Sequence, residues 1–236
     1  MDIIIPTCNK YLPIVEANLH GLDYFWKDRG NIVILGYDSP QFSLPERTQF
    51  VSLGKDETPS KWSDGLLKFF DSYKENRFIL HMDDHCIVSP VKTDKIEKID
   101  QIMSCDESID KIMLHPFLVK IPLKRYEYEG LDLFICENNY GSTTLMPAVW
   151  RTAYMKRLLN KELDAHSFEC QADYDSIQNK TLSTHNEILM ISSLINNGVR
   201  NRYWNVCWHR NEFVFQPPNE KYVTEINKII DTTKFQ

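Results

Sequence analysis

The segment "FILHMDDHCIV" at residues 78–88 carries the strongest chemical signal in the chain, because an apolar run ends in Asp83, Asp84 and His85. Two carboxylates held about 4 Å apart repel each other by ~4 kcal/mol at an effective dielectric of about 20. A divalent cation between them reverses that sign, and Mg²⁺ and Mn²⁺ prefer oxygen ligands. The motif therefore predicts a metal site, against the plainer alternative that both aspartates cap a turn and face water.

The backbone conformation at the motif decides where these side chains point. If the extended strand continues, His81, Asp83 and His85 share one side of it. A backbone that leaves the strand after Met82 would instead bring both carboxylates toward one point. Ligands of open α/β sheets gather outside the carboxyl ends of the strands, and this motif ends the fourth predicted strand.

The first half of the chain alternates apolar strands with amphipathic helices. We expect strands at 2–6, 31–38, 49–53 and 77–82, and helices at 9–22, 60–73 and 93–105. Pro13 suits the first turn of its helix, and Thr93 is the expected N-cap of the third. Strands separated by helices require crossover connections, so the pattern predicts an α/β fold with a mostly parallel central sheet flanked by helices.

From residue 110 the pattern changes to that of a mixed or antiparallel region. Strands are expected at 111–121 and 126–137, with Gly130 at a turn or bulge, and strand character recurs at 199–212. Helices are expected at 146–159, opened by Pro147, and at 219–230, whereas 186–195 fits either type. No linker or repeat interrupts residues 1–236, so we expect a single domain.

Composition excludes several classes of protein. A net charge of −6 and a pI near 5.7 argue against a general nucleic-acid binder. We expect neither a signal peptide nor an integral membrane segment, because no long apolar stretch is present. Six cysteines without a paired spacing suit reduced thiols, which favours a cytoplasmic location. The oligomeric state stays open.

The order of elements, with an acidic motif at the end of the fourth strand, resembles the nucleotide-sugar glycosyltransferases of the GT-A fold. The resemblance implies a divalent metal, Mn²⁺ or Mg²⁺, which a DxD-type motif holds against the donor diphosphate. Its first and third positions fall on Asp83 and His85, with Asp84 between them. Because His85 stands where an aspartate is usual, either the histidine is a metal ligand or the adjacent pair Asp83 and Asp84 binds the metal.

Two further segments resemble the nucleotide-binding part of that family. "IIIPTCNK" would place Thr7 near the base or ribose, and "ILGYDS" would place Tyr37 and Asp38 near the nucleobase. The resemblance implies that residues 1–90 form the nucleotide-binding half and residues 91–236 the acceptor-side half.

Acidic residues and a histidine in the second half complete the predicted site. In inverting members of the family a carboxylate deprotonates the acceptor hydroxyl, and Glu169 is our first choice for it, with Asp173 second. The Phe168 ring is expected to shield Glu169; alternatively, these are first-turn acids that the helix dipole favours. His209 is a candidate extra metal ligand, although a histidine beside a tryptophan is more often packed.

Taken together, the resemblance implies a metal-dependent glycosyltransferase that moves a sugar from a nucleoside diphosphate sugar to a hydroxyl acceptor, such as a glycan. A sugar nucleotidyltransferase is the alternative enzyme, although no glycine-rich phosphate loop follows the first strand. A catalytically silent sugar-binding module on the same scaffold is the alternative of a different class.

Overall fold

The computed structural model describes residues 1–115, 124–128, 130–136, 142–160, 162–171, 180–184, 186, 188–196, 199–201, 208–209, 213–214 and 219–232. Within them, nine strands form one sheet in the order β3-β2-β1-β4-β9-β6-β10-β8-β7. The strands are β1 (Ile3–Pro6), β2 (Ile32–Gly36), β3 (Thr48–Ser52), β4 (Arg77–Leu80), β6 (Ile109–Met113), β7 (Lys124–Tyr128), β8 (Leu131–Ile135), β9 (Ala148–Arg151) and β10 (Lys180–Thr184).

Strand directions confirm the predicted α/β class. β3, β2, β1 and β4 are parallel neighbours, as are β6 and β10. β9 runs against β4 and β6, and β8 runs against β10 and β7. The sheet is therefore mostly parallel in its first half and mixed in its second, as the sequence predicts. Gly130, with φ +73°, connects β7 to β8 at the expected turn.

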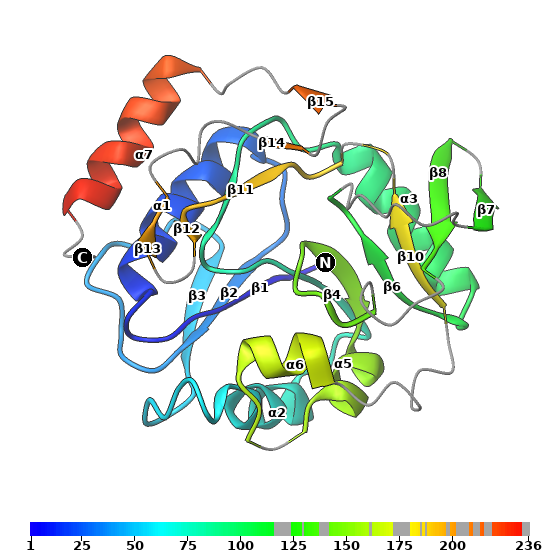
Figure 1. Cartoon of the computed structure of the whole chain (residues 1–236), viewed down its shortest axis with the longest axis horizontal. Coiled ribbons are helices and arrows are strands. Elements are labelled where there is room, and N and C mark those ends of the chain that lie inside the picture. The colour runs from blue at the N-terminus through cyan, green and yellow to red at the C-terminus, as the bar shows by residue number, and fades with distance from the viewer. Residues whose placement is uncertain are drawn as a thin grey trace.

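Helices cover both faces of the sheet because the buried strands are apolar on both sides. Ile3 and Ile5 of β1 face a layer that contains α1 (Leu12–Phe25) and α3 (Thr93–Cys105). Ile4 faces the opposite layer, formed by α2 (Trp62–Ser72), α5 (Thr152–Leu158) and α6 (Ala165–Gln171). Figure 1 shows α7 (Glu220–Thr232) outside α1, where Tyr222 packs in a cluster with Ile14.

Short strand pairs border the sheet. β5 (His85–Ile87) pairs antiparallel with β11 (Ile191–Ser193), so the ambiguous segment 186–195 contains a strand. β12 (Ile195–Asn196) pairs with β13 (Val199–Arg200), and β14 (Trp208–His209) pairs with β15 (Phe213–Val214). No helix in the described ranges is long and apolar enough to cross a membrane.

Two local predictions are wrong. The helix expected at 146–159 is β9 followed by α5, because β9 lies between β4 and β6 with Val149 and Trp150 fully buried. A strand buried on both faces has no alternation to separate it from a buried helix. Thr93 is also not the N-cap of α3, which Lys92 occupies. The Thr93 hydroxyl instead accepts from Trp26 Nε1 at 3.0 Å.

Candidate active site

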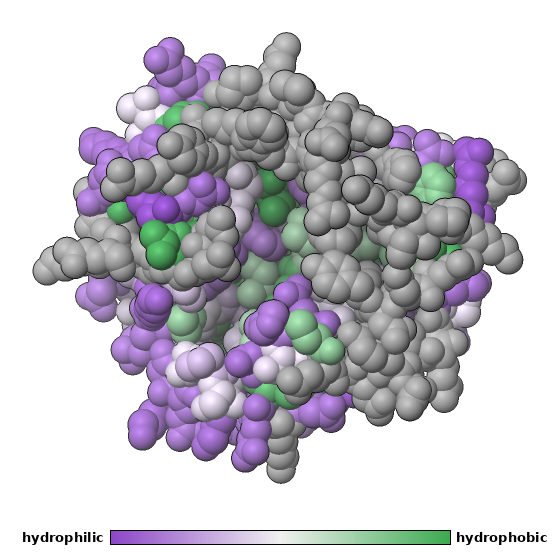
Figure 2. Space-filling model, in the orientation of Figure 1, coloured by the Kyte–Doolittle hydropathy of each residue, from purple (hydrophilic) through white to green (hydrophobic). Residues whose placement is uncertain are grey.

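A cavity of about 880 Å³ lies at the carboxyl ends of β1 and β4. From β1 the chain continues to β2 and β3 on one side, whereas β4 pairs on the other, so the strand order reverses here. Such switch points are where ligands bind in open α/β sheets. Figure 2 shows this face hollowed near its centre. The lining comes from the loops after β1, β3 and β4, from the start of α2, from α6 and from β12. It includes Thr7, Cys8, Lys10, Tyr11, Asp56, Thr58, Pro59, Trp62, Met82, Asp83, Asp84, His166, Glu169 and Ile195.

The acidic motif is a turn that a buried asparagine of α1 holds in place. β4 ends at Leu80, Asp83 and Asp84 form the turn, and β5 begins at His85. Asn18 Nδ2 donates to the carbonyl oxygens of Met82 at 2.9 Å, Asp83 at 3.2 Å and His85 at 2.8 Å. The extended alternative for the motif is therefore excluded, and both carboxylates line the cavity.

The carboxylates of Asp83 and Asp84 differ in their surroundings. Asp83 is 6% exposed, and burial, reinforced by the charge of Asp84, raises its pKa to about 7 against a weaker lowering by the Thr7 hydroxyl. Asp84 accepts a hydrogen bond from the Ser193 hydroxyl of β11. A buried carboxylate next to a second one is costly without a cation, so this pair suits a metal ion.

The two histidines proposed as metal ligands are not both described at the side-chain level. His85 is not in the cavity lining, and its Nε2 lies 3.8 Å from Asp84 Oδ1. Burial lowers the pKa of His85, against the raising effect of Asp84 and Glu169. His209 pairs with Phe213 through the backbone, and its side chain lies outside the described part, as does Asp173. Among the described side chains, no group of three His, Cys, Asp or Glu could hold a metal.

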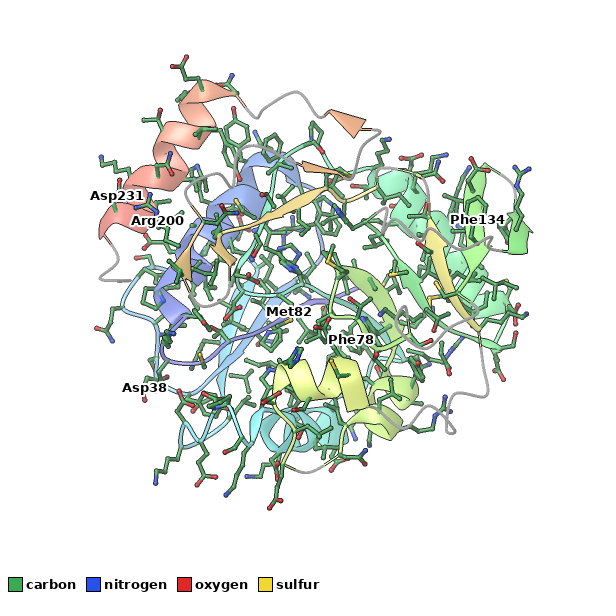
Figure 3. All side chains as sticks on the ribbon, viewed as in Figure 1. Asp38, Phe78, Met82, Phe134, Arg200 and Asp231 are labelled. Carbon is green, nitrogen blue, oxygen red and sulfur yellow. The ribbon has the colours of Figure 1, made fainter. Side chains whose placement is uncertain are left out.

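The loops after β1 and β2 end side by side, as the nucleotide-site prediction requires. Thr7 N donates to Leu35 O at 2.8 Å, and Asn9 Nδ2 donates to Asp38 Oδ2 at 2.8 Å. Asp38 is nevertheless exposed and outside the cavity lining, at the edge of the view in Figure 3. Tyr37 is buried and also outside the lining. Of these residues, Thr7 has the most direct access to the cavity.

Asp56, in the loop after β3, lines the cavity and was not predicted. It accepts from Asn9 N at 3.0 Å and from Thr58 N at 2.9 Å. Although burial acts to raise its pKa, the hydrogen bonds from Thr58 and Asn9 outweigh burial and lower it. The available signal was the Asp-x-Thr spacing, since an aspartate often bonds the backbone two residues on.

Glu169 lies on α6 and lines the same cavity as the acidic turn. Its Oε1 accepts from Leu145 N at 2.6 Å and from the Thr144 hydroxyl at 3.2 Å. Phe168, the expected shield, is fully buried and packs against Trp62, a residue of the cavity lining, with ring centroids 5.5 Å apart. Hydrogen bonds from the segment 142–145 fix this carboxylate.

Comparison with known proteins gives structural matches only. No family profile matches the chain, and no curated protein does. Bifunctional IspDF from Campylobacter jejuni matches at 14% identity and TM-score 0.45, over 79% of this chain and 50% of that one. TarS from S. aureus in complex with UDP-GlcNAc matches at 11% identity and TM-score 0.48, over 80% and 56%. Galactosyltransferase LgtC in complex with donor and acceptor sugar analogs matches at 10% identity and TM-score 0.41, over 76% and 67%.

The chain thus spans about half the length of the first two of these proteins. Glycosyltransferases are among the solved structures that it resembles.

Proposed function

We propose that this chain is a glycosyltransferase that moves a sugar from a nucleoside diphosphate sugar to a hydroxyl acceptor. One observation carries the proposal: a single cavity at the sheet's switch point is lined both by the paired carboxylates Asp83 and Asp84 and by the fixed carboxylate Glu169. Its volume of about 880 Å³ is within the range of small-molecule sites. Thr7 and Asp56 line the nucleoside side of this cavity.

The acidic turn fits a divalent metal ion. Mg²⁺ that serves nucleotide chemistry is commonly held by one or two carboxylates, with substrate phosphates and water as the other ligands. Asp83 and Asp84 provide two such carboxylates, and the burial of Asp83 beside Asp84, which raises its pKa, supports a cation between them. A metal ion held there would neutralise the negative charge of the leaving diphosphate.

Glu169 is suited to act on the acceptor. Both hydrogen bonds from residues 144 and 145 go to Oε1, and no described residue donates to Oε2. The second oxygen is therefore available to a ligand in the cavity. In an inverting reaction Glu169 would take the proton from the acceptor hydroxyl as it attacks the sugar on the face opposite the diphosphate.

The alternatives predict different products. A sugar nucleotidyltransferase would join a sugar phosphate to a nucleoside triphosphate and release pyrophosphate. Against it, the cavity-lining loop from Thr7 to Tyr11 contains no glycine that could let the backbone approach phosphates closely. A binding module would release no product at all.

Product analysis tests the proposal. The chain is incubated with nucleotide sugars and simple saccharide acceptors, in Mn²⁺ or in EDTA, and released nucleotides are quantified by chromatography. We expect nucleoside diphosphate release in Mn²⁺ only, with loss in Asp84→Asn and retention in the matched control Asp71→Asn, an exposed aspartate of α2 that pairs with Lys156. Pyrophosphate release from triphosphates, or equal release in EDTA, would reject it.

A further inference from the structure

Lys111 is a fully buried lysine in the middle of the sheet. It lies on β6 at 0% exposure, where its neighbours Ile112 and Met113 are apolar. Its Nζ donates to Thr144 O at 2.6 Å and to Ser142 O at 3.4 Å. Nζ also lies 4.1 Å from the ring centroid of Trp150. Burial lowers the pKa of Lys111 to about 7, so this amine occupies an unfavourable place for a charge.

The segment that Lys111 contacts is the one that holds Glu169. The Thr143 hydroxyl donates to Glu169 O at 2.7 Å, and Leu145 N and the Thr144 hydroxyl both donate to Glu169 Oε1. Thr144 is the common residue, since its carbonyl accepts from Lys111 and its hydroxyl donates to Glu169. A continuous chain of hydrogen bonds therefore runs from β6 to the cavity wall.

Packing alone does not explain a lysine at this position. An apolar side chain of similar length would fill the same space without the desolvation cost, and such replacements of buried charges are often neutral or stabilising. What the amine supplies, and an apolar residue does not, is a donor for two carbonyl oxygens of the segment 142–145.

We propose that Lys111 is a positioning residue for Glu169. By holding the carbonyl groups of Ser142 and Thr144, it fixes the donors that orient Oε1 and so directs Oε2 toward the acceptor. This role rests on the proposed function, in which Glu169 acts on the acceptor hydroxyl. Nothing in the role requires Lys111 to touch substrate.

A double-mutant comparison tests this role in the enzyme. Lys111→Met should lower kcat by about 10- to 100-fold, because a misplacement of about 1 Å can cost ~100-fold. Donor KM should stay within about twofold, since the donor side of the cavity is unchanged. On a Glu169→Gln background, Lys111→Met should not lower kcat further, because Lys111 acts on the reaction only through the Glu169 carboxylate. A normal kcat in Lys111→Met, or a full further loss on that background, would overturn the role.

The matched control is Asp110→Asn. Asp110 is the preceding residue of β6, is equally buried, and pairs with Arg157 of α5. The Asp110→Asn substitution should destabilise the fold while leaving kcat near the wild-type value. If Lys111→Met does not fold, Thr144→Val removes only the hydroxyl that reaches Glu169, and we expect it to lower kcat with unchanged donor KM.

An activity-independent measurement separates this inference from the proposed function. The Leu145 amide donates to Glu169 Oε1, and its hydrogen exchange should be at least ~10-fold faster in Lys111→Met. A factor of about 10 is what the loss of one hydrogen bond would produce. In Asp110→Asn the exchange of this amide should speed up by no more than the measured loss of global stability accounts for. Faster exchange with an inactive wild-type chain would reject the function and keep the positioning. An active wild-type chain with unchanged Leu145 exchange in Lys111→Met would reject the positioning alone.

Discussion

The buried side-chain amide of Asn18 donates a 2.8 Å hydrogen bond to the carbonyl oxygen of His85, which is 67 residues away along the chain. The same amide donates to the carbonyl oxygens of Met82 and Asp83. Helix α1 therefore sets the backbone of the acidic turn before any ligand arrives. Pre-organisation of this kind reduces the cost of binding, because the loop is already ordered.

Replacing Asn18 should affect both stability and metal-dependent binding. Asn18→Leu keeps the branched shape of the side chain but leaves three carbonyl oxygens without this donor, so the free energy of unfolding should fall by about 1–3 kcal/mol. Urea denaturation measures the change, and Asn31→Leu, an exposed asparagine with one 3.3 Å hydrogen bond to Asp2, is the control. Nucleotide affinity in Mn²⁺ should fall as well. Equal stability of Asn18→Leu and wild type would show that the turn does not depend on Asn18.

Without metal, the free energy of unfolding should fall as the pH rises between the unfolded-state and folded-state pKa values of Asp83. Its pKa is raised from 3.8 to about 7 in the folded state. Between these values the folded chain retains a proton that the unfolded chain has lost, so rising pH favours unfolding. The loss should be on the order of a few kcal/mol and absent in Asp83→Asn. Asp83→Asn should therefore be the more stable protein at pH 8 without metal.

This pH effect is measured as the difference in unfolding free energy between wild type and Asp83→Asn from pH 4 to pH 8. A difference that does not change with pH would contradict the raised pKa. Adding Mn²⁺ at pH 8 should stabilise the wild type and leave Asp83→Asn nearly unchanged.

Glu169→Gln should separate chemistry from binding. The glutamine carbonyl still accepts from Leu145 N and Thr144, so the fold and the affinity for donor and metal should be retained. The value of kcat should fall at least ~100-fold, as expected for loss of a general base. Glu57→Gln, an exposed glutamate paired with Lys61, is the control. Near-normal turnover of Glu169→Gln, or a product with retained anomeric configuration, would remove Glu169 as the base.

Asp56 and Asp38 should differ in their effect on the donor. Asp56→Ala should raise donor KM at least ~10-fold with a smaller change in kcat, because its contact is similar in the ground and transition states. Asp38→Ala should also raise KM more than it lowers kcat, but by a smaller factor, since Asp38 is exposed and acts through Asn9. Steady-state kinetics at saturating acceptor gives both values. A larger KM effect from Asp38→Ala would restore it as the direct contact.

The first half of the fold was predictable because its strands and helices differ in both length and periodicity. Only a strand fits the apolar runs around Ile4 and Val33, and only a helix fits the stripe of Val15, Leu19 and Leu22. β9 was not predictable, because the strand is buried on both faces, with Val149 and Trp150 fully buried, and α5 begins directly after it. The periodicity of apolar residues does not distinguish a strand from a helix where neither face is exposed to water.

The candidate site was predictable only in part, for a related reason. Asp83, Asp84, Thr7 and Glu169 could be found because their residue types and positions suggest chemistry. The contacts that hold them come from distant segments, as with Asn18 at the acidic turn or Lys111 behind Thr144. A sequence shows neither which carbonyl a buried amide reaches nor that the chain turns at Asp83 rather than continuing as a strand.

Calorimetric titration of nucleoside diphosphates tests the central claim most directly, because it measures the donor site without requiring the right sugar or acceptor. The wild-type chain is titrated with UDP, GDP, CDP and ADP in Mn²⁺, and then in EDTA. We expect at least one diphosphate to bind in Mn²⁺, and to bind at least ~10-fold more weakly in EDTA, since the acidic turn otherwise repels phosphate. Binding of none of the four in Mn²⁺, or equal affinity in EDTA, would contradict a metal-dependent nucleotide site at Asp83 and Asp84.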